Sequence, residues 1–311
     1  MAKTYEFPGD RVHYSWDAGN EPGLTIESGA TVVFRTRDVT DNQIGPGSTS
    51  ADLVSLDLAR LYPLAGPVSV FGAEPGDALA IEVLEVETQG WGFAAIIPGL
   101  GLLTEDFTEP YLRLFELTDG RHAHLREDVA IPVEPFFGTM GVCPRAAHDQ
   151  SVVPPGTFGG NMDTRQLTAG ATLYLPVQLH GALFSCGDAH AAQGDGEVCV
   201  TGIEAPMRGV LRFELHKGRS LPGPQFRTGG RLTPGANTGK WYGTTGIGSD
   251  LYRAAQDAVR AMLDHLEMTY ALSREDAYIL ASLVVDLKIA EIVDGGQYVV
   301  SALLPTCVFQ T

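Results

Sequence analysis

Short apolar runs separated by turn residues occupy the chain as far as Ile203. Typical runs are LTIESGATVVFRTRDV, from Leu24, and VSVFGAEPGDALAIEVLEVE, from Val68, in which apolar and polar positions alternate. Such alternation places successive side chains on opposite faces of a strand. The 37 glycines and 19 prolines interrupt any helical period. We therefore expect a mainly β fold, with many short strands in a sandwich or a barrel and no long helix before Ile203.

A glycine turn followed by a strand pattern recurs three times, at Gly29, Gly76 and Gly170. Each copy continues through a small or acidic residue into alternating positions. The spacing is not constant, so the copies indicate one structural step used repeatedly and not a true repeat. Between the first two copies, residues 50–60 have apolar spacing that allows one or two helical turns.

The pattern changes near the C-terminus, where apolar residues adopt helical spacing. One helix is predicted from Ser249, as its N-cap, to about Glu267, and a second from Ser273 through residue 287, with Asp276 completing a start like a capping box. Two strands, 288–293 and 297–304, follow and are joined by a hairpin turn at residues 294–296. We expect three parts: residues 1–207 as a β-sandwich and barrel-like catalytic region, 208–247 as a strand and a Gly/Pro-rich loop, and 248–311 as a small α+β unit.

Charge and targeting signals narrow the possible partners. The formal net charge is −17, from 38 acidic and 21 basic residues. This excess argues against binding to nucleic acid, which requires clustered lysine and arginine, and favours a small neutral or cationic substrate or a metal cation. The N-terminus lacks the apolar core of a signal peptide, and no run approaches the ~18 apolar residues of a membrane helix. We expect a cytoplasmic protein without a membrane partner.

The segment 181–204, GALFSCGDAHAAQGDGEVCVTGIE, contains the densest group of candidate ligands. Asp188 and His190 are two residues apart, as are Asp195 and Glu197, so an extended backbone would place each pair on one face. The segment is predicted as turn, strand, turn, strand. Its apolar flanks put the carboxylates close to a core, where they need a partner. A second interpretation remains open, in which Asp and Gly only form turns and His190 is a hydrogen-bonded histidine at a strand end.

Other acidic residues beside turns could join this group. Asp38, Asp41 and Asp163 follow strand ends or glycine turns, and His13 is free to return in space. Each alone is better explained as a turn former or a solvated residue than as a ligand. Carboxylates combined with imidazole suit zinc, manganese or calcium. The four cysteines show no CxxC spacing and are expected to be buried thiols; Cys186 is a weaker candidate nucleophile. No GxSxG, Walker, HExxH or strand-linked GxGxxG motif is present.

Five stretches resemble those of a known protein family: HYSWD at 13–17, TRDVTD at 36–41, YPLAGPVSVFGAEPGD at 62–77, PGTFGGNMD at 155–163 and LYLPVQLHGALFSCGDAHAAQGDGEVCVTGIE at 173–204. Together they closely resemble the acetamidase/formamidase family. The resemblance implies a jelly-roll-like β-sandwich joined to a barrel-like β unit and closed by the C-terminal α+β segment. It also implies a homodimer or higher homo-oligomer.

The same resemblance implies hydrolysis of a short aliphatic amide, formamide or acetamide, to ammonia and a carboxylate. It implies a divalent metal, zinc as the usual ion and calcium as a possible one, held by Asp188 and His190, with Asp38 and Asp163 as further candidates. The metal would acidify water and polarise the amide oxygen, while Glu204 or Glu197 moves the proton to the leaving nitrogen. Backbone N–H groups of Gly159 and Gly160 would assist the oxyanion.

The expected substrate pocket is small, and its candidate walls are Phe158, Gly159, Gly160, Trp241 and Tyr242. Each aromatic residue is better explained by ordinary packing. Two other functions remain open from the sequence. One is hydrolysis of another small substrate with a C–N bond. The other is a non-enzymatic β-sandwich that binds calcium or carbohydrate through an Asp-rich loop, against which His190 and the apolar flanks argue.

Overall fold

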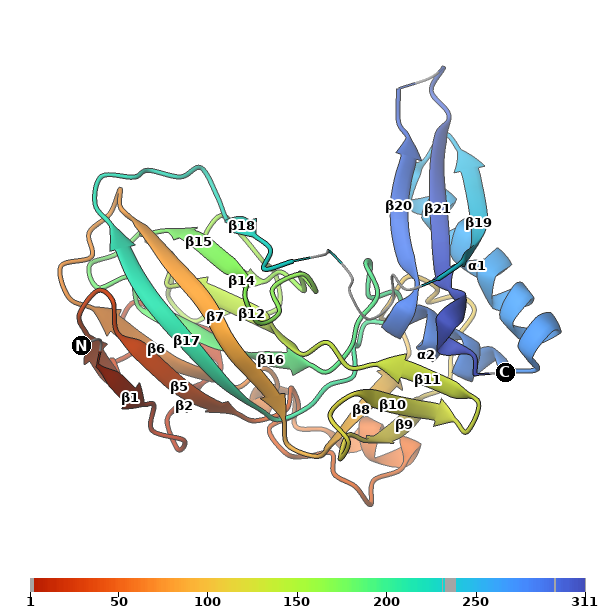
Figure 1. The fold of residues 1–311 in the computed structure, drawn as a ribbon, viewed down its shortest axis with the longest axis horizontal. Helices are drawn as coiled ribbons and strands as arrows, with labels where there is room; N and C mark the ends of the chain where they lie inside the picture. The colour runs from red at the N-terminus through yellow and green to blue at the C-terminus, as the bar shows by residue number, and fades with distance from the viewer. Residues whose placement is uncertain (1–2, 231, 233–238, 294, 311) are drawn as a thin grey trace.

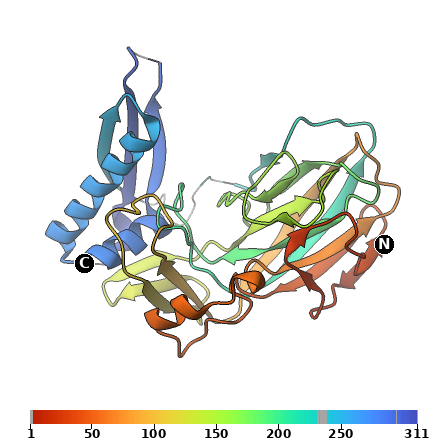
Figure 2. The ribbon, with the colours of Figure 1, turned by 180° about the vertical axis from the view of Figure 1, so that it is seen from behind.

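The computed structural model describes residues 3–230, 232, 239–293 and 295–310. These residues form two lobes, a larger all-β lobe that contains the N-terminal strand and a smaller one that contains both α-helices and the last strands (Figure 1, Figure 2). The mainly β prediction is confirmed. The expected hairpin turn includes Asp294, and the expected loop includes residues 231 and 233–238; these positions lie outside the described residues.

The first sheet of the larger lobe has six strands in the order β1-β5-β17-β7-β15-β18. Only β1 and β5 are parallel neighbours. The strands are β1 (Thr4–Glu6), β5 (Thr31–Thr36), β17 (Met207–His216), β7 (Ala78–Thr88), β15 (Thr172–Pro176) and β18 (Gln225–Arg227). Because β17 lies between β5 and β7, the sheet continues across residue 207, where the sequence suggested a boundary. The three-part division stays a prediction.

The second sheet carries the residues that matter most for function. Its order is β14-β12-β16-β6-β2, and β4 pairs with β6 in parallel. The strands are β14 (Gly159–Asn161), β12 (Phe136–Val142), β16 (Phe184–His190), β6 (Leu64–Val70), β2 (Val12–His13) and β4 (Leu24–Ile26). Every residue of β12 and β16 is buried, so the polar side chains at the end of β16 lie inside the protein.

The two sheets pack against each other through aromatic side chains. Phe184 of β16 lies 6.1 Å from Phe34 of β5 and 5.0 Å from Phe213 of β17, measured between ring centroids. The three rings are fully buried, and each contributes a large apolar area to the core. The expected barrel-like unit is not found, because each sheet order among the described residues is an open path. The jelly-roll-like connection of the strands stays a prediction.

Smaller elements connect the lobes and cover the sheets. Three two-stranded ribbons pair β3 (Ser15–Trp16) with β13 (Gln150–Ser151), β8 (Trp91–Ile96) with β9 (Tyr111–Glu116), and β10 (His122–Arg126) with β11 (Val129–Pro132). The predicted helical turns in residues 50–60 are the short 3₁₀ helices η1 (Ser50–Ser55) and η2 (Leu58–Arg60), and a third, η3 (Thr306–Val308), follows the last strand.

The smaller lobe consists of a three-stranded sheet and two helices: β19 (Trp241–Gly248), α1 (Leu251–Tyr270), α2 (Arg274–Val284), β20 (Asp286–Glu291) and β21 (Tyr298–Pro305). Helix α1 packs along β19 and β21, burying Val259, Met262 and Leu263 (Figure 1). Ser273 caps α2 as predicted, but α1 is capped by Asp250 and not by Ser249. Helix α2 ends at Val284, short of the predicted residue 287, and β20 begins at Asp286. Within the described ranges, no helix is both long and apolar enough to cross a membrane.

The central segment departs from its prediction in its second half. Residues 184–190 form β16, as expected, but residues 191–203 form no strand; Glu204 makes only single bridges to His190 and Phe93. Glu197 and Val200 have φ of 42° and 82°, which ends any extended run. This segment is held by the smaller lobe: Gly194 N–H donates to Ser282 O, Leu287 N–H donates to Asp195 O, and the Asp286 carboxylate accepts from Asp195 N–H.

Candidate metal centre

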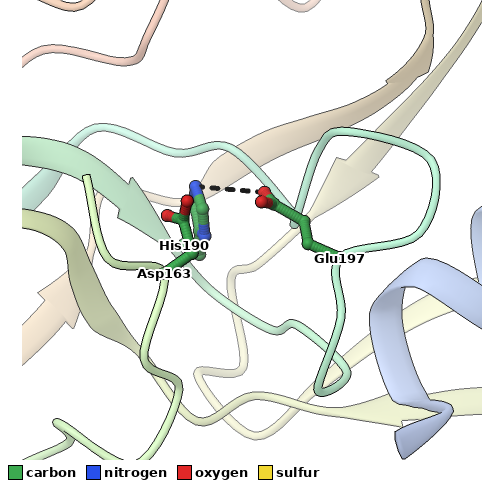
Figure 3. Close-up of side chains that lie close together, drawn as sticks. All are labelled: Asp163, His190 and Glu197. Atoms are coloured by element: carbon green, nitrogen blue, oxygen red, sulfur yellow. Dashed lines mark ion pairs between the residues drawn. The ribbon is translucent and has the colours of Figure 1, made fainter. Parts of the chain in front are cut away.

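Five side chains converge near the end of β16: Asp163, Asp188, His190, Glu197 and Glu204, hereafter the acidic cluster. They form two overlapping groups that share His190, one with Asp163 and Glu197 and one with Asp188 and Glu204. Within each group the potential ligand atoms lie within 4.8 Å of one another. Figure 3 shows Asp163, His190 and Glu197 turned toward a common point. From His190 Nε2, the nearest oxygens of Glu204, Asp188 and Glu197 are at 3.1, 3.5 and 3.9 Å.

The cluster is assembled from three segments far apart in sequence. Asp188 and His190 lie at the end of β16, Glu197 and Glu204 lie in the segment that follows, and Asp163 follows β14. Asp163, Asp188 and Glu197 have φ of 46°, 48° and 42°. The left-handed region is unusual for residues with a Cβ, and such backbone strain collects at functional sites. The backbone is therefore bent at three of the five positions to aim side chains inward.

Gly138 on β12 leaves the room that this arrangement needs. A Cβ at position 138 would lie 2.5 Å from Asp163 Oδ1 and 3.1 Å from His190 Cε1. Any larger residue would therefore displace one of the two side chains. Thr139, the next residue on β12, bonds through its hydroxyl to Asn161 Oδ1 at 2.8 Å and approaches Asp188 Oδ2 at 3.4 Å. The strand thus both makes space for the cluster and orients one of its carboxylates.

Three buried atoms of the cluster have no hydrogen-bond partner: Asp163 Oδ1, His190 Nε2 and Glu204 Oε2. Native proteins pair nearly all such atoms, and an unpaired one costs about 1–3 kcal/mol. Since all three atoms belong to one cluster, a single bound ion could contact all of them. The donor set, carboxylate oxygens and an imidazole nitrogen, is suited to a divalent metal ion.

Gln193 fixes the orientation of His190. Its amide nitrogen donates to the Asp163 carbonyl at 2.8 Å, so its amide oxygen is the atom 2.8 Å from His190 Nδ1. An oxygen there can only accept, which places a proton on Nδ1; in the neutral ring the Nε2 lone pair then faces the carboxylates. Metal-binding histidines use the same device, in which a second hydrogen bond selects the tautomer.

The charges of the cluster are not balanced by the protein. Among the described residues, neither lysine nor arginine forms an ion pair with any of its four carboxylates. Burial raises the pKa of Glu204 to about 7, and burial with the charge of Asp188 raises the pKa of Asp163 to about 6. Burial alone would lower the pKa of His190, but Glu204 and Asp188 outweigh it and raise that pKa. Without a cation the cluster retains protons near neutral pH, and a binding cation would have to displace them.

Tyr62 also lies near the cluster, because the carbonyl of the next residue, Pro63, approaches Gly187 beside Asp188. The sequence analysis did not single it out as a site residue. Burial raises the pKa of its phenol, and the negative charges of Asp188 and Glu204 raise it further. Gln193 and Gly138 were likewise missed. Gln193 has a usable signal, because it follows His190 by three residues in the same dense segment; Gly138 has none beyond its place in an apolar run.

Several predicted site residues lie elsewhere. The Asp38 carboxylate is used locally, since it accepts from Thr40 N–H at 2.8 Å and Asn42 N–H at 3.0 Å, and it belongs to neither metal-binding group. Asp195 was expected on the same face as Glu197, but it does not join the cluster; its carboxylate accepts from Gln166 Nε2 at 2.9 Å. The two residues differ because the expected extended backbone is absent there.

The predicted pocket residues are also dispersed. Phe158 packs edge-on against Trp16 at 5.4 Å, and Gly159 N–H already donates to Gly156 O at 3.0 Å. Gly160 pairs with Met140 in the ladder between β14 and β12. Trp241 lines a pocket of about 280 Å³ with Asp195, Asp286, Lys288 and Leu303, in which none of the five cluster residues takes part. Tyr242 stacks on His265 at 3.5 Å.

The cysteines give no support to a thiol nucleophile. Cys186 is fully buried, and burial raises the pKa of its thiol well above the ordinary value. A protonated thiol is a poor nucleophile. Cys143 and Cys199 are buried as expected, whereas Cys307 is exposed, so the prediction of four buried thiols is wrong at that position.

Solved structures share this fold. A γ-lactamase from Delftia acidovorans superposes with a TM-score of 0.92 at 24% identity, covering 99% of this chain and 94% of that one. An acetamidase from Bacillus halodurans superposes with a TM-score of 0.69 at 32% identity, covering 97% of each chain.

Sequence comparison points the same way. The chain is 27% identical to the acetamidase of Mycolicibacterium smegmatis over 251 residues, 61% of this chain and 62% of the relative. It is 27% identical to the formamidase of Methylophilus methylotrophus over 267 residues, 68% and 65% of the two chains. It thus spans a little under two thirds of the length of these relatives. The model of the acetamidase/formamidase family matches residues 3–152 and 145–311. The chain therefore belongs to the acetamidase/formamidase family.

Proposed function

We propose that this protein is a metal-dependent amidase that hydrolyses a short aliphatic amide, such as formamide or acetamide, to ammonia and a carboxylate. The observation that carries the proposal is the convergence of three unpaired buried atoms, from Asp163, His190 and Glu204, in a cluster without a balancing lysine or arginine. The relatives named for activity on acetamide and formamide supply the substrate class.

The donor set fits a divalent cation, with zinc as our first choice. Asp163, Asp188, His190 and Glu204 would hold it. The imidazole favours zinc over calcium, which takes oxygen ligands almost exclusively. Calcium remains the alternative if the carboxylates alone dominate. Such an ion, when bound, supplies Lewis-acid activation of water and of the amide carbonyl.

The two glutamates are suited to different roles. The Glu204 side chain is only 3% exposed and lies 3.1 Å from His190 Nε2, whereas the Glu197 side chain is 17% exposed and lies 3.9 Å away. A proton shuttle must reach both the attacking water and the leaving nitrogen, which requires access to the substrate side. We therefore assign the shuttle to Glu197 and a ligand role to Glu204. Glu197 takes a proton from water and delivers it to nitrogen, so that ammonia leaves.

The test is ammonia release from formamide and acetamide by the purified protein. We expect release to disappear after chelation and to return with zinc. Return with calcium alone would identify calcium as the cofactor. A wider panel of longer amides, cyclic amides, ureas and nitriles would detect another small C–N substrate. No release from any of these with any metal would contradict the amidase assignment, and calcium binding without turnover would instead support a binding protein.

Two further expectations join this proposal: a cytoplasmic location and assembly into a homodimer or higher homo-oligomer. Neither follows from the site itself. Sedimentation of the purified protein would measure the assembly state, and fractionation of the source cells would test the location.

A further inference from the structure

Tyr62 lies just before β6, a neighbour of β16, the strand that carries Asp188 and His190. It directly precedes Pro63 and β6, and β6 pairs with β16 through Ala65 and Cys186. At Gly187, next to Asp188, an added Cβ would lie 2.7 Å from Pro63 O, so the two backbones are in close contact there. The N-terminal end of β6, which Tyr62 precedes by two residues, therefore adjoins the acidic cluster.

The backbone of Tyr62 is held in an unusual conformation. Its φ is 57°, and its N–H donates to Val39 O at 2.8 Å. For a bulky residue this left-handed conformation costs on the order of 1–3 kcal/mol and persists only where the surroundings impose it. Asp163, Asp188 and Glu197 share this conformation. Tyr62 thus resembles the cluster residues in having its side-chain direction fixed by a strained backbone.

The hydroxyl of Tyr62 differs from those of three other tyrosines that also lie in or near the core. Tyr14 donates to Asp41 at 2.9 Å, Tyr111 donates to Asp276 at 2.8 Å, and Tyr278 donates to Val198 O. The ring of Tyr62 packs against the core, yet within the described part of the chain its hydroxyl has no hydrogen-bond partner. The charges that act on this phenol are the four carboxylates of the cluster. Tyr62 is half-buried, so its hydroxyl is neither used by the protein nor sealed in the core, and it can donate to a bound molecule.

The site needs such a donor. As water adds to an amide carbonyl, negative charge develops on the carbonyl oxygen, and four nearby carboxylates disfavour it. Preorganised donors aimed at that oxygen stabilise the transition state. Among the described residues, no lysine or arginine pairs with the cluster, and Gly159 N–H is already bonded. Tyr62 can supply a neutral O–H, since the next residue, Pro63, lies against Gly187 beside Asp188.

We propose that Tyr62 is a catalytic hydrogen-bond donor, whose hydroxyl donates to the carbonyl oxygen of the bound amide. The proposal rests on the proposed amidase function. No proton is transferred from Tyr62: the bond strengthens as charge builds on the oxygen and weakens as the carbonyl reforms. The proton for the leaving nitrogen comes from Glu197.

The test compares Tyr62→Phe with Tyr111→Phe, which removes a tyrosine hydroxyl that is bonded to Asp276 outside the site. Both variants are measured for kcat and KM with acetamide, zinc content and thermal unfolding. We expect Tyr62→Phe to lower kcat by about 10²–10³-fold, the usual effect of losing one oxyanion donor. Its zinc content and unfolding temperature should match the wild type, and Tyr111→Phe should keep the wild-type kcat.

Other outcomes separate this proposal from the function on which it rests. If the wild type releases ammonia and Tyr62→Phe keeps its kcat, the donor role is wrong and the amidase stands. If Tyr62→Phe loses zinc, Tyr62 orients ligands and is not a donor to substrate. If the wild type hydrolyses nothing, calorimetry with acetohydroxamate, whose carbonyl oxygen binds metal, decides. Weaker binding to zinc-loaded Tyr62→Phe, by about tenfold, supports the donor, and equal binding overturns it.

Discussion

Asp41 and the acidic cluster are both buried acidic sites, but their charges are balanced in different ways. The Asp41 side chain is 1% exposed and accepts from Arg37 and Arg60, both at 2.6 Å, and from Tyr14 at 2.9 Å. Burial would raise the pKa of Asp41, but the bonds from Arg37 and Arg60 outweigh it and lower that pKa. In the cluster, burial prevails and raises the pKa of both glutamates.

The difference separates structural from functional carboxylates. Burial alone does not, since Asp41, Asp286 and Glu204 are all buried. Asp286 resembles Asp41, because it pairs with Arg165 at 2.7 Å. What distinguishes the cluster is that its partners are missing from the protein. A buried carboxylate with its own arginine, or with backbone N–H donors as at Asp38, is satisfied by the fold. Several buried carboxylates that converge without either kind of partner indicate an external cation.

The largest expected effect comes from breaking the cluster itself. We expect Asp188→Asn to abolish zinc binding and to lower kcat/KM by at least about 10³-fold, because a neutral amide replaces a charged ligand. Elemental analysis and ammonia release would measure both. Asp41→Asn is the matched control and should keep its zinc. Equal loss of zinc in the two variants would show that an arginine partner does not distinguish structural carboxylates from metal ligands.

The next effect distinguishes the two glutamates within the cluster. Glu197→Gln should lower kcat by about 10²–10⁴-fold while zinc remains bound, as expected for loss of an acid–base group. Glu204→Gln should lose zinc, because it removes a ligand. Metal content measured beside kcat for both variants tests the assignment, and the reverse pattern would exchange the two roles.

A smaller effect is expected for Gln193. It orients His190 through Nδ1 and does not contact the atoms that would bind the metal. Gln193→Leu removes the acceptor at His190 Nδ1 and frees the ring and its tautomer. Zinc affinity should fall by about 10–100-fold, the usual effect of losing such a partner. Competition with a chelator of known affinity would measure it. Gln166, which bonds to Asp195 outside the cluster, offers a control: Gln166→Leu should bind zinc as the wild type does.

The smallest effect concerns stability at Asp41. Asp41→Asn should lower the free energy of unfolding by about 1–3 kcal/mol, because charge-assisted hydrogen bonds are lost. The folded pKa of Asp41 is lowered, so its contribution is complete above the unfolded pKa and disappears as the pH falls through the folded value. Denaturant unfolding at pH 7 and in acid would show a difference between wild type and variant that shrinks in acid. A constant difference would argue against ionic stabilisation.

The features readable from sequence are those with local causes. Gly29, Gly76 and Gly170 all have positive φ, and each lies two residues before the first residue of its strand, β5, β7 or β15. Ser273 caps α2. The pairing of Asp188 with His190 was predictable from strand spacing. The strand predicted after Gly194 was wrong, because Glu197 and Val200 turn the chain to contact the smaller lobe. Gly138 and Tyr62 lie near the cluster only because segments distant in sequence pack together. No local sequence pattern predicts such contacts.

The segment that carries Glu197 is held by residues from the end of the chain. Asp195 N–H bonds to Asp286, which follows it by 91 positions, and Leu287 N–H bonds to Asp195 O. During translation, at about 5–20 residues per second, the larger lobe therefore emerges several seconds before the residues that hold this segment in place. A nascent or prematurely terminated chain would fold much of its β-structure without a finished centre. On the proposed function, the order of synthesis would delay metal capture until the polypeptide is nearly whole.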